Sequence, residues 1–124
     1  MRASARWRRR RAVPTDSSTA CSASPEFPSA AAADLPPQIA ESLANHQLPL
    51  SYTAFEAPAN TAAWRDKPTF YVITTKDKVI APEAQRFFAA RMKAQTMDVA
   101  GSHASLVVHA NEVAAAIEKA ALAE

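Results

Sequence analysis

The stretch TFYVITTKDKVIAP at residues 69–82 decides the fold of this chain. Residues 69–74 are a short β-branched and aromatic run of the kind that parallel sheets bury on both faces. Asp77 follows this predicted strand, and Pro82 stands where a helix begins, because proline suits the first helical turn. The stretch therefore predicts a strand that delivers a carboxylate to a turn and is followed by a helix.

The residues after Pro82 continue with a second strand, a polar turn and another helix. The helix at Pro82 carries an apolar stripe that we expect to pack inward, made of Ala84, Phe87, Phe88 and Met92. Residues 96–100 form the second predicted strand, which leads through Gly101 to His103. The last helix opens at Asn111 and has an inward stripe of Val113, Ala116, Ile117, Ala120 and Ala121. This β-α-β-α order predicts an α/β fold with parallel strands and a right-handed crossover.

The upstream residues divide into two parts. A helix is predicted over residues 35–46, and residues 49–67 connect it to the first strand. Residues 1–33 are rich in Arg, Ser, Ala and Pro and show no periodic pattern, so we expect them to be disordered. We therefore expect a disordered segment over residues 1–33 and a partial domain over residues 34–124.

Charge changes at the same boundary. Residues 1–33 hold six arginines against Asp16 and Glu26, a net charge of +4, whereas residues 34–124 hold eight basic and ten acidic side chains, a net charge of −2. The arginine-rich segment fits a contact with nucleic acid or membrane, an organellar transit peptide, an ordinary disordered extension, or upstream DNA read as protein. Because the two charges oppose each other, the formal +2 of the chain does not indicate a specific nucleic-acid-binding domain.

Composition excludes several classes of site. Gly101 is the only glycine among 124 residues, so phosphate-binding loops, dinucleotide-binding turns and a GxSxG turn are absent. Cys21 is the only cysteine, which excludes an internal disulfide and fits a cytoplasmic protein. The three histidines do not follow a metal-site spacing, and no apolar run reaches the roughly 18 residues of a membrane span. We expect no cofactor, no metal and no membrane segment.

Asp77 and His103 follow successive predicted strands. The carboxyl ends of parallel strands share one edge of a sheet, so both side chains are expected at that edge. There a carboxylate can accept the Nδ1–H of an imidazole and stabilise the imidazolium. Each residue alone also fits a bland interpretation, Asp77 as a solvated turn between two lysines and His103 as a locally bonded turn residue. Their joint spacing favours the pair, in the order of the last two members of a Ser-Asp-His triad.

A set of short segments across residues 34–124 carries a family resemblance: Asp34-Leu-Pro, Ala63-Trp64, Lys67-Pro68, Phe70-Tyr-Val, Asp77, Ile80, Pro82, Gln85-Arg86-Phe87, Arg91-Met92, Ser102-His103-Ala104 and Glu112-Val113-Ala114. With these segments, residues 34–124 resemble the C-terminal third of small cap-bearing α/β-hydrolases, near the salicylate-esterase and hydroxynitrile-lyase group. The resemblance implies that Asp77 is the acid and His103 the base of a catalytic triad. It also implies a small ester or amide as the substrate of the intact relative.

The chain departs from that family in its upstream part. The first six strands, the oxyanion loop and the glycine-framed nucleophile have no counterpart here, and no serine of this chain has that frame. We therefore expect a truncated hydrolase that is inactive alone. Two alternatives remain: a non-catalytic interaction module that pairs with a partner or with itself through an open strand edge, and one half of a split hydrolase that needs a complementing chain.

Overall fold

A parallel β-α-β unit forms the centre of the computed structural model, which describes residues 25–48 and 50–123. Within these ranges, β1 (Phe70–Thr74) pairs in parallel with β2 (Gln95–Val99), from Phe70 opposite Gln95 to Thr74 opposite Val99. The helix α4 (Pro82–Arg91) connects them. The α/β class and the β-α-β-α order expected from the sequence are confirmed, with strand limits within one residue of the expected ones.

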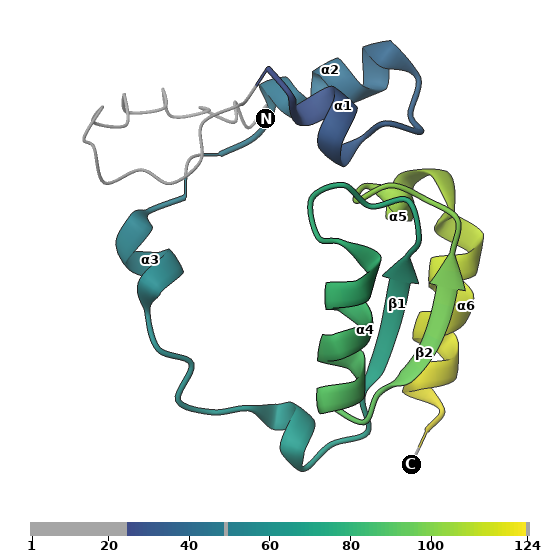
Figure 1. Ribbon diagram of the computed structural model, residues 1–124. Helices are drawn as coiled ribbons and strands as arrows, with labels where there is room; N and C mark the ends of the chain where they lie inside the picture. Colours follow the sequence, from purple (N-terminus) through teal and green to yellow (C-terminus); the bar gives the residue numbers. More distant parts are fainter. Residues whose placement is uncertain (1–24, 49, 124) are drawn as a thin grey trace, which may run out of the picture.

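Helices cover both faces of this small sheet (Figure 1). The crossover helix α4 packs against β1 on the face that carries Tyr71, and α6 (Ala110–Ala121) packs on the opposite face, near Phe70 and Val72. A short helix, α5 (Ser105–Val108), links β2 to α6. The strands therefore end in loops between the two helical layers, where side chains can converge.

The inward face of α4 differs from the expected apolar stripe. Gln85 and Ala89 are its buried residues, whereas Phe87 and Phe88 are 62% and 45% exposed. The reason is polar, since the amide of Gln85 reaches back to Thr74 at the end of β1 and thereby fixes the rotation of the helix. The expected stripe of α6 is also only partly correct, because Ile117 is 64% exposed.

The described part of the chain begins with two helices, α1 (Phe27–Ala31) and α2 (Pro37–Asn45). The second confirms the helix expected over residues 35–46. The first corrects the expectation of disorder up to residue 33, because Ala31 and Ala32 are buried and the Ala31 carbonyl accepts a hydrogen bond from a distant loop. Tertiary packing, which composition does not reveal, orders this segment. The remaining residues of the expected disordered segment, 1–24, lie outside the described ranges.

The segment between α2 and β1 has little regular structure. It contains one short helix, α3 (Tyr52–Glu56), and a 3-10 turn, η1 (Ala63–Arg65). In η1 the guanidinium of Arg65 lies 5.3 Å from the Trp64 ring centroid, a cation–π distance. No helix among residues 25–48 and 50–123 is long and apolar enough to cross a membrane.

The hydrophobic core is small and centres on Ile73, which is 1% exposed. We expect Ile73→Val to lower the free energy of unfolding by about 0.5–1.5 kcal/mol, because it removes one buried methylene. The matched change Ile117→Val alters a side chain that is 64% exposed, so its effect should stay within about 0.5 kcal/mol. Urea unfolding followed by circular dichroism measures both. Equal effects of the two changes would contradict this location of the core.

Candidate active site

The Asp77 carboxylate is buried at the carboxyl end of β1. A turn places it there, in which the Asp77 N–H donates to the Thr74 carbonyl at 3.2 Å. Its side chain is only 2% exposed. The Oδ1 atom accepts the backbone N–H groups of Val79 and Ile80 at 2.8 and 3.0 Å. The loop backbone thus satisfies Oδ1, and Oδ2 is left to accept hydrogen bonds from side chains.

The second oxygen, Oδ2, is shared by three side chains. It lies 2.9 Å from His103 Nδ1, 2.8 Å from the Thr74 hydroxyl and 3.0 Å from the Gln85 amide nitrogen. Burial alone raises the pKa of Asp77, but hydrogen bonds from Ile80, His103, Thr74 and Val79 outweigh it, so this pKa lies below its ordinary value of 3.8. The carboxylate therefore stays ionised beside the imidazole at neutral pH.

His103 projects from the loop after β2 toward this carboxylate, so the structure brings together the two residues that the sequence predicts. The ionised carboxylate can only accept a hydrogen bond, so Nδ1 of a neutral imidazole carries the proton and Nε2 presents its lone pair. The imidazole side chain is 43% exposed. One nitrogen is thus fixed inside the protein, while the side chain remains accessible to a reacting group.

Gln85 is a site residue to which sequence reasoning gave no role. It is 3% exposed, and its amide nitrogen donates to Asp77 Oδ2 and to the Ile80 carbonyl at 3.0 and 2.8 Å. Its amide oxygen accepts the Thr74 N–H at 2.9 Å. One side chain therefore joins the strand end to the loop that carries the acid. The resemblance includes Gln85 in a matching segment without a role, and the expected apolar stripe of the helix obscured its inward position.

The loop that carries His103 is fixed by the segment after α1. The Asp34 carboxylate accepts hydrogen bonds from the backbone N–H of Ser102, at 2.7 Å, and from its hydroxyl. Ser102 is 1% exposed, and its hydroxyl also lies 3.0 Å from the Ala31 carbonyl. Ser102 therefore faces away from His103, and among the described residues no serine hydroxyl is hydrogen-bonded to the imidazole.

The other two histidines have their Nδ1 atoms bonded elsewhere. His46 Nδ1 contacts the Ser42 carbonyl at 2.6 Å, and His109 Nδ1 contacts Glu112 at 3.1 Å. No group of three His, Cys, Asp or Glu side chains within residues 25–48 and 50–123 has the arrangement of a metal site. The chemistry of the described residues is therefore concentrated in the Asp77–His103 pair.

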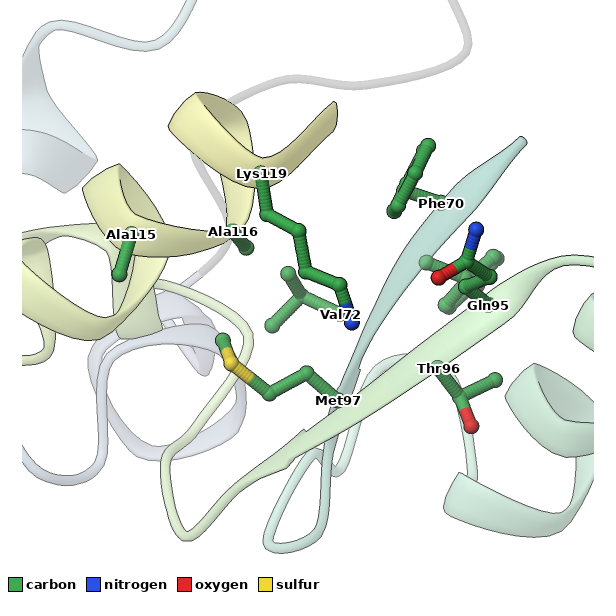
Figure 2. A pocket seen from close by; sticks show the side chains of 9 residues that line it. Phe70, Val72, Gln95, Thr96, Met97, Ala115, Ala116 and Lys119 are labelled. Atoms are coloured by element: carbon green, nitrogen blue, oxygen red, sulfur yellow. The ribbon is translucent and has the colours of Figure 1, made fainter. Parts of the chain in front are cut away.

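A groove of about 340 Å³ runs from this pair along β1. Its lining combines the strand with residues from both helical layers: Phe70, Tyr71, Val72, Thr74, Asp77, Ile80, Gln85, His103, Ser105, Leu106 and Val113. A second cavity, of about 250 Å³, lies between α6 and the amino-terminal half of the strands (Figure 2). There Phe70, Val72 and Met97 face the small side chains of Ala115 and Ala116. Of these two hollows, only the groove contains the acid and the histidine.

Comparison with known proteins identifies the family. Residues 1–116 match the model of the α/β-hydrolase family. This match covers most of the chain, so the protein belongs to the α/β-hydrolase family. No curated protein and no solved structure matches the chain.

The buried acid makes the stability of the fold depend on pH. The folded-state pKa of Asp77 lies below its ordinary value of 3.8, so its contribution is present at neutral pH and is lost as pH falls from about 5 through the folded-state pKa. We expect Asp77→Asn to lower the free energy of unfolding at pH 7 by about 1–3 kcal/mol. The loss should shrink toward pH 3 in urea titrations.

Asp66→Asn is the matched control, since Asp66 is an exposed acid after η1. It should leave unfolding unchanged at both pH values. Some acid dependence should remain in the Asp77 variant, because hydrogen bonds from Ser102 also lower the pKa of Asp34 against the opposing effect of burial. A loss that stays constant from pH 7 to pH 3 would contradict an ionised Asp77.

Proposed function

We propose that residues 34–124 carry the acid and the base of a serine hydrolase that cleaves small esters or amides. The observation behind this proposal is the 2.9 Å contact between His103 Nδ1 and a carboxylate that is 2% exposed. Membership of the α/β-hydrolase family supports it. The finer assignment, to the C-terminal third of a cap-bearing member near the salicylate-esterase and hydroxynitrile-lyase group, rests on the quoted sequence resemblance.

In this proposal His103 acts as general base and then as general acid. Its Nε2 takes the proton of a serine hydroxyl as that oxygen attacks the acyl carbon, and returns it to the leaving group. Asp77 holds the tautomer and stabilises the imidazolium that forms between these steps. Thr74 and Gln85 keep the carboxylate oriented through Oδ2.

The serine in this proposal comes from outside the described residues. The buried Ser102 hydroxyl contacts Asp34 and Ala31 rather than His103. Without a nucleophile and an oxyanion site, an acid–base pair gives little rate enhancement. Because no serine in the sequence has the glycine frame of a nucleophile, the chain is proposed to be a truncated hydrolase that is inactive alone.

A chimera tests this function. Residues 34–124 replace the corresponding C-terminal segment of an intact α/β-hydrolase, and hydrolysis of p-nitrophenyl acetate is followed. We expect turnover that His103→Ala lowers by at least about 10³-fold and Asp77→Asn by a similar factor. His46→Ala, at an exposed histidine at the end of α2, is the matched control and should keep full activity. Turnover that survives His103→Ala would exclude the proposed base.

An alternative function uses the open edge of β1 as a docking surface. The Thr75 N–H donates to the Val99 carbonyl and the Thr69 carbonyl accepts from Gln95, so the backbone groups of odd-numbered residues in β1 face β2. Those of Phe70, Val72 and Thr74 therefore face the other edge. The Thr74 N–H already donates a hydrogen bond to the Gln85 amide oxygen. An added strand would pair with Phe70 and Val72 in the groove.

The occupant proposed for this edge is a strand with apolar side chains on both faces, from a second copy of the chain or from a complementing hydrolase half. Its supporting observation is that the groove is walled by residues of both helical layers, Ile80 from the α4 side and Val113 from α6. Such a position suits a strand covered on both faces. If the complementing half carries the serine, esterase activity should appear only on mixing the two chains.

Proline substitutions test self-association through this edge. Val72→Pro removes an outward N–H of β1, and Thr96→Pro removes the equivalent outward N–H of β2. If the β1 edge is the contact, sedimentation velocity should show a dimer. Val72→Pro should raise its dissociation constant at least about 10-fold, whereas Thr96→Pro should leave the dissociation constant unchanged. A monomeric parent chain, or a dimer sensitive only to Thr96→Pro, would reject this surface.

A further inference from the structure

The two backbone amides that flank His103 are hydrogen-bonded to the last residue of α1 and to the turn that follows it. The Ser102 N–H donates to Asp34 Oδ2 at 2.7 Å, and the Ala104 N–H donates to the Ala31 carbonyl at 2.7 Å. His103 thus lies between two fixed points. Both acceptors come from residues about seventy positions earlier in the sequence, in the helical pair α1–α2.

The opposite side of the loop is fixed by the strand that carries the acid. The Lys76 N–H donates to the Gly101 carbonyl at 3.1 Å, one residue before Ser102. Gly101 has no room for a side chain, because a Cβ there would lie 2.7 Å from Ser105 Cβ and 3.3 Å from Asp34 Oδ2. The absence of a side chain therefore lets Ser105 and His109, which a Cβ would meet at 2.7 and 2.9 Å, pack against the loop beside the Asp34 carboxylate.

We propose that Asp34 is a positioning residue for His103, which holds the histidine loop so that Nδ1 meets Asp77; its catalytic meaning rests on the function proposed above. Without Asp34 the loop would keep its bonds to Lys76 and Ala31, but the residue before His103 would lose its anchor, and the Nδ1–Asp77 hydrogen bond would have to order that part of the loop. The conformational entropy lost on fixing a backbone residue opposes this hydrogen bond with a free energy of similar size. The hydrogen bonds of the Ser102 and Ala104 N–H groups offset this loss of entropy, so the Nδ1–Asp77 bond does not have to order the loop by itself.

Figure 1 shows where the helices that flank Asp34 lie relative to the sheet. The helices α1 and α2 lie beyond the carboxyl ends of the two strands, on the side to which β1 and β2 point. Asp34 lies in the turn between them. The turn therefore faces the loop after β2, whereas the acid loop after β1 binds the same loop through Lys76.

Nuclear magnetic resonance on the full chain tests this role without any turnover. Hydrogen exchange is measured at the amides of Ser102 and Ala104, together with the Nδ1–H signal of His103, in the parent protein and in Asp34→Asn. The variant keeps the shape of the side chain but offers one acceptor oxygen in place of two. We expect exchange at both amides to accelerate at least 10-fold and the Nδ1–H signal to weaken, while the Thr75 amide in the sheet keeps its protection.

Two further variants separate positioning from general stability. Glu41→Gln changes an exposed acid on α2 and should leave every signal as in the parent protein. Ser102→Ala removes the hydroxyl contact with Asp34 but keeps the backbone one, so it should weaken the Nδ1–H signal by less than Asp34→Asn does. A purely structural role for Asp34 would instead accelerate exchange at Ser102, Ala104 and Thr75 together.

Two results would overturn the proposal. One is rapid exchange of the Ser102 and Ala104 amides in the parent protein, a result that needs no variant to fold. The other is an unchanged Nδ1–H signal of His103 in folded Asp34→Asn. Either outcome is distinct from failure of the hydrolase function, which would appear as chimera turnover that does not depend on His103 while the exchange pattern stays as expected.

Discussion

The buried carboxylate of Asp77 is the interaction on which the rest of this structure depends. It accepts five hydrogen bonds, two from the loop backbone and three from the side chains of Thr74, Gln85 and His103. A buried charge is tolerated only when its lone pairs are satisfied. The turn after β1, the rotation of α4 and the place of the histidine loop all serve that requirement. Polar bonding therefore organises a domain whose hydrophobic core is small.

The same arrangement explains why the pair has different exposure at its two ends. Asp77 is 2% exposed and His103 is 43% exposed. The buried carboxylate orients the imidazole and supplies a negative charge beside it, while the imidazole itself stays accessible to a reacting group. This division of roles is what acyl transfer requires of an acid and a base, and it supports the hydrolase proposal within a family that the comparison with known proteins establishes.

Sequence reasoning recovered the strands, the main helices and the Asp77–His103 pair, because hydrophobic runs and the order of parallel units have strong local signals. It quoted Gln85 and Asp34 in matching segments but gave neither a role, because their roles depend on contacts with residues far away in the chain. It also placed Phe87 and Phe88 inside, since an apolar stripe on α4 outweighs a single polar residue in any pattern of hydrophobicity. In the structure Gln85 is buried and the two phenylalanines are largely exposed, because the buried Asp77 carboxylate needs the hydrogen bond that the Gln85 amide donates.

The amide of Gln85 has a consequence for aggregation. By taking the Thr74 N–H, it ends the exposed row of backbone groups on β1 just below the acid. An edge strand is hazardous in proportion to the length of ladder it offers to other chains, and here the row available for pairing stops at Val72. The side chain that steadies the acid is also a terminator of sheet growth. Loss of Gln85 would therefore remove a hydrogen bond from Asp77 and also leave the Thr74 N–H available for pairing with another chain.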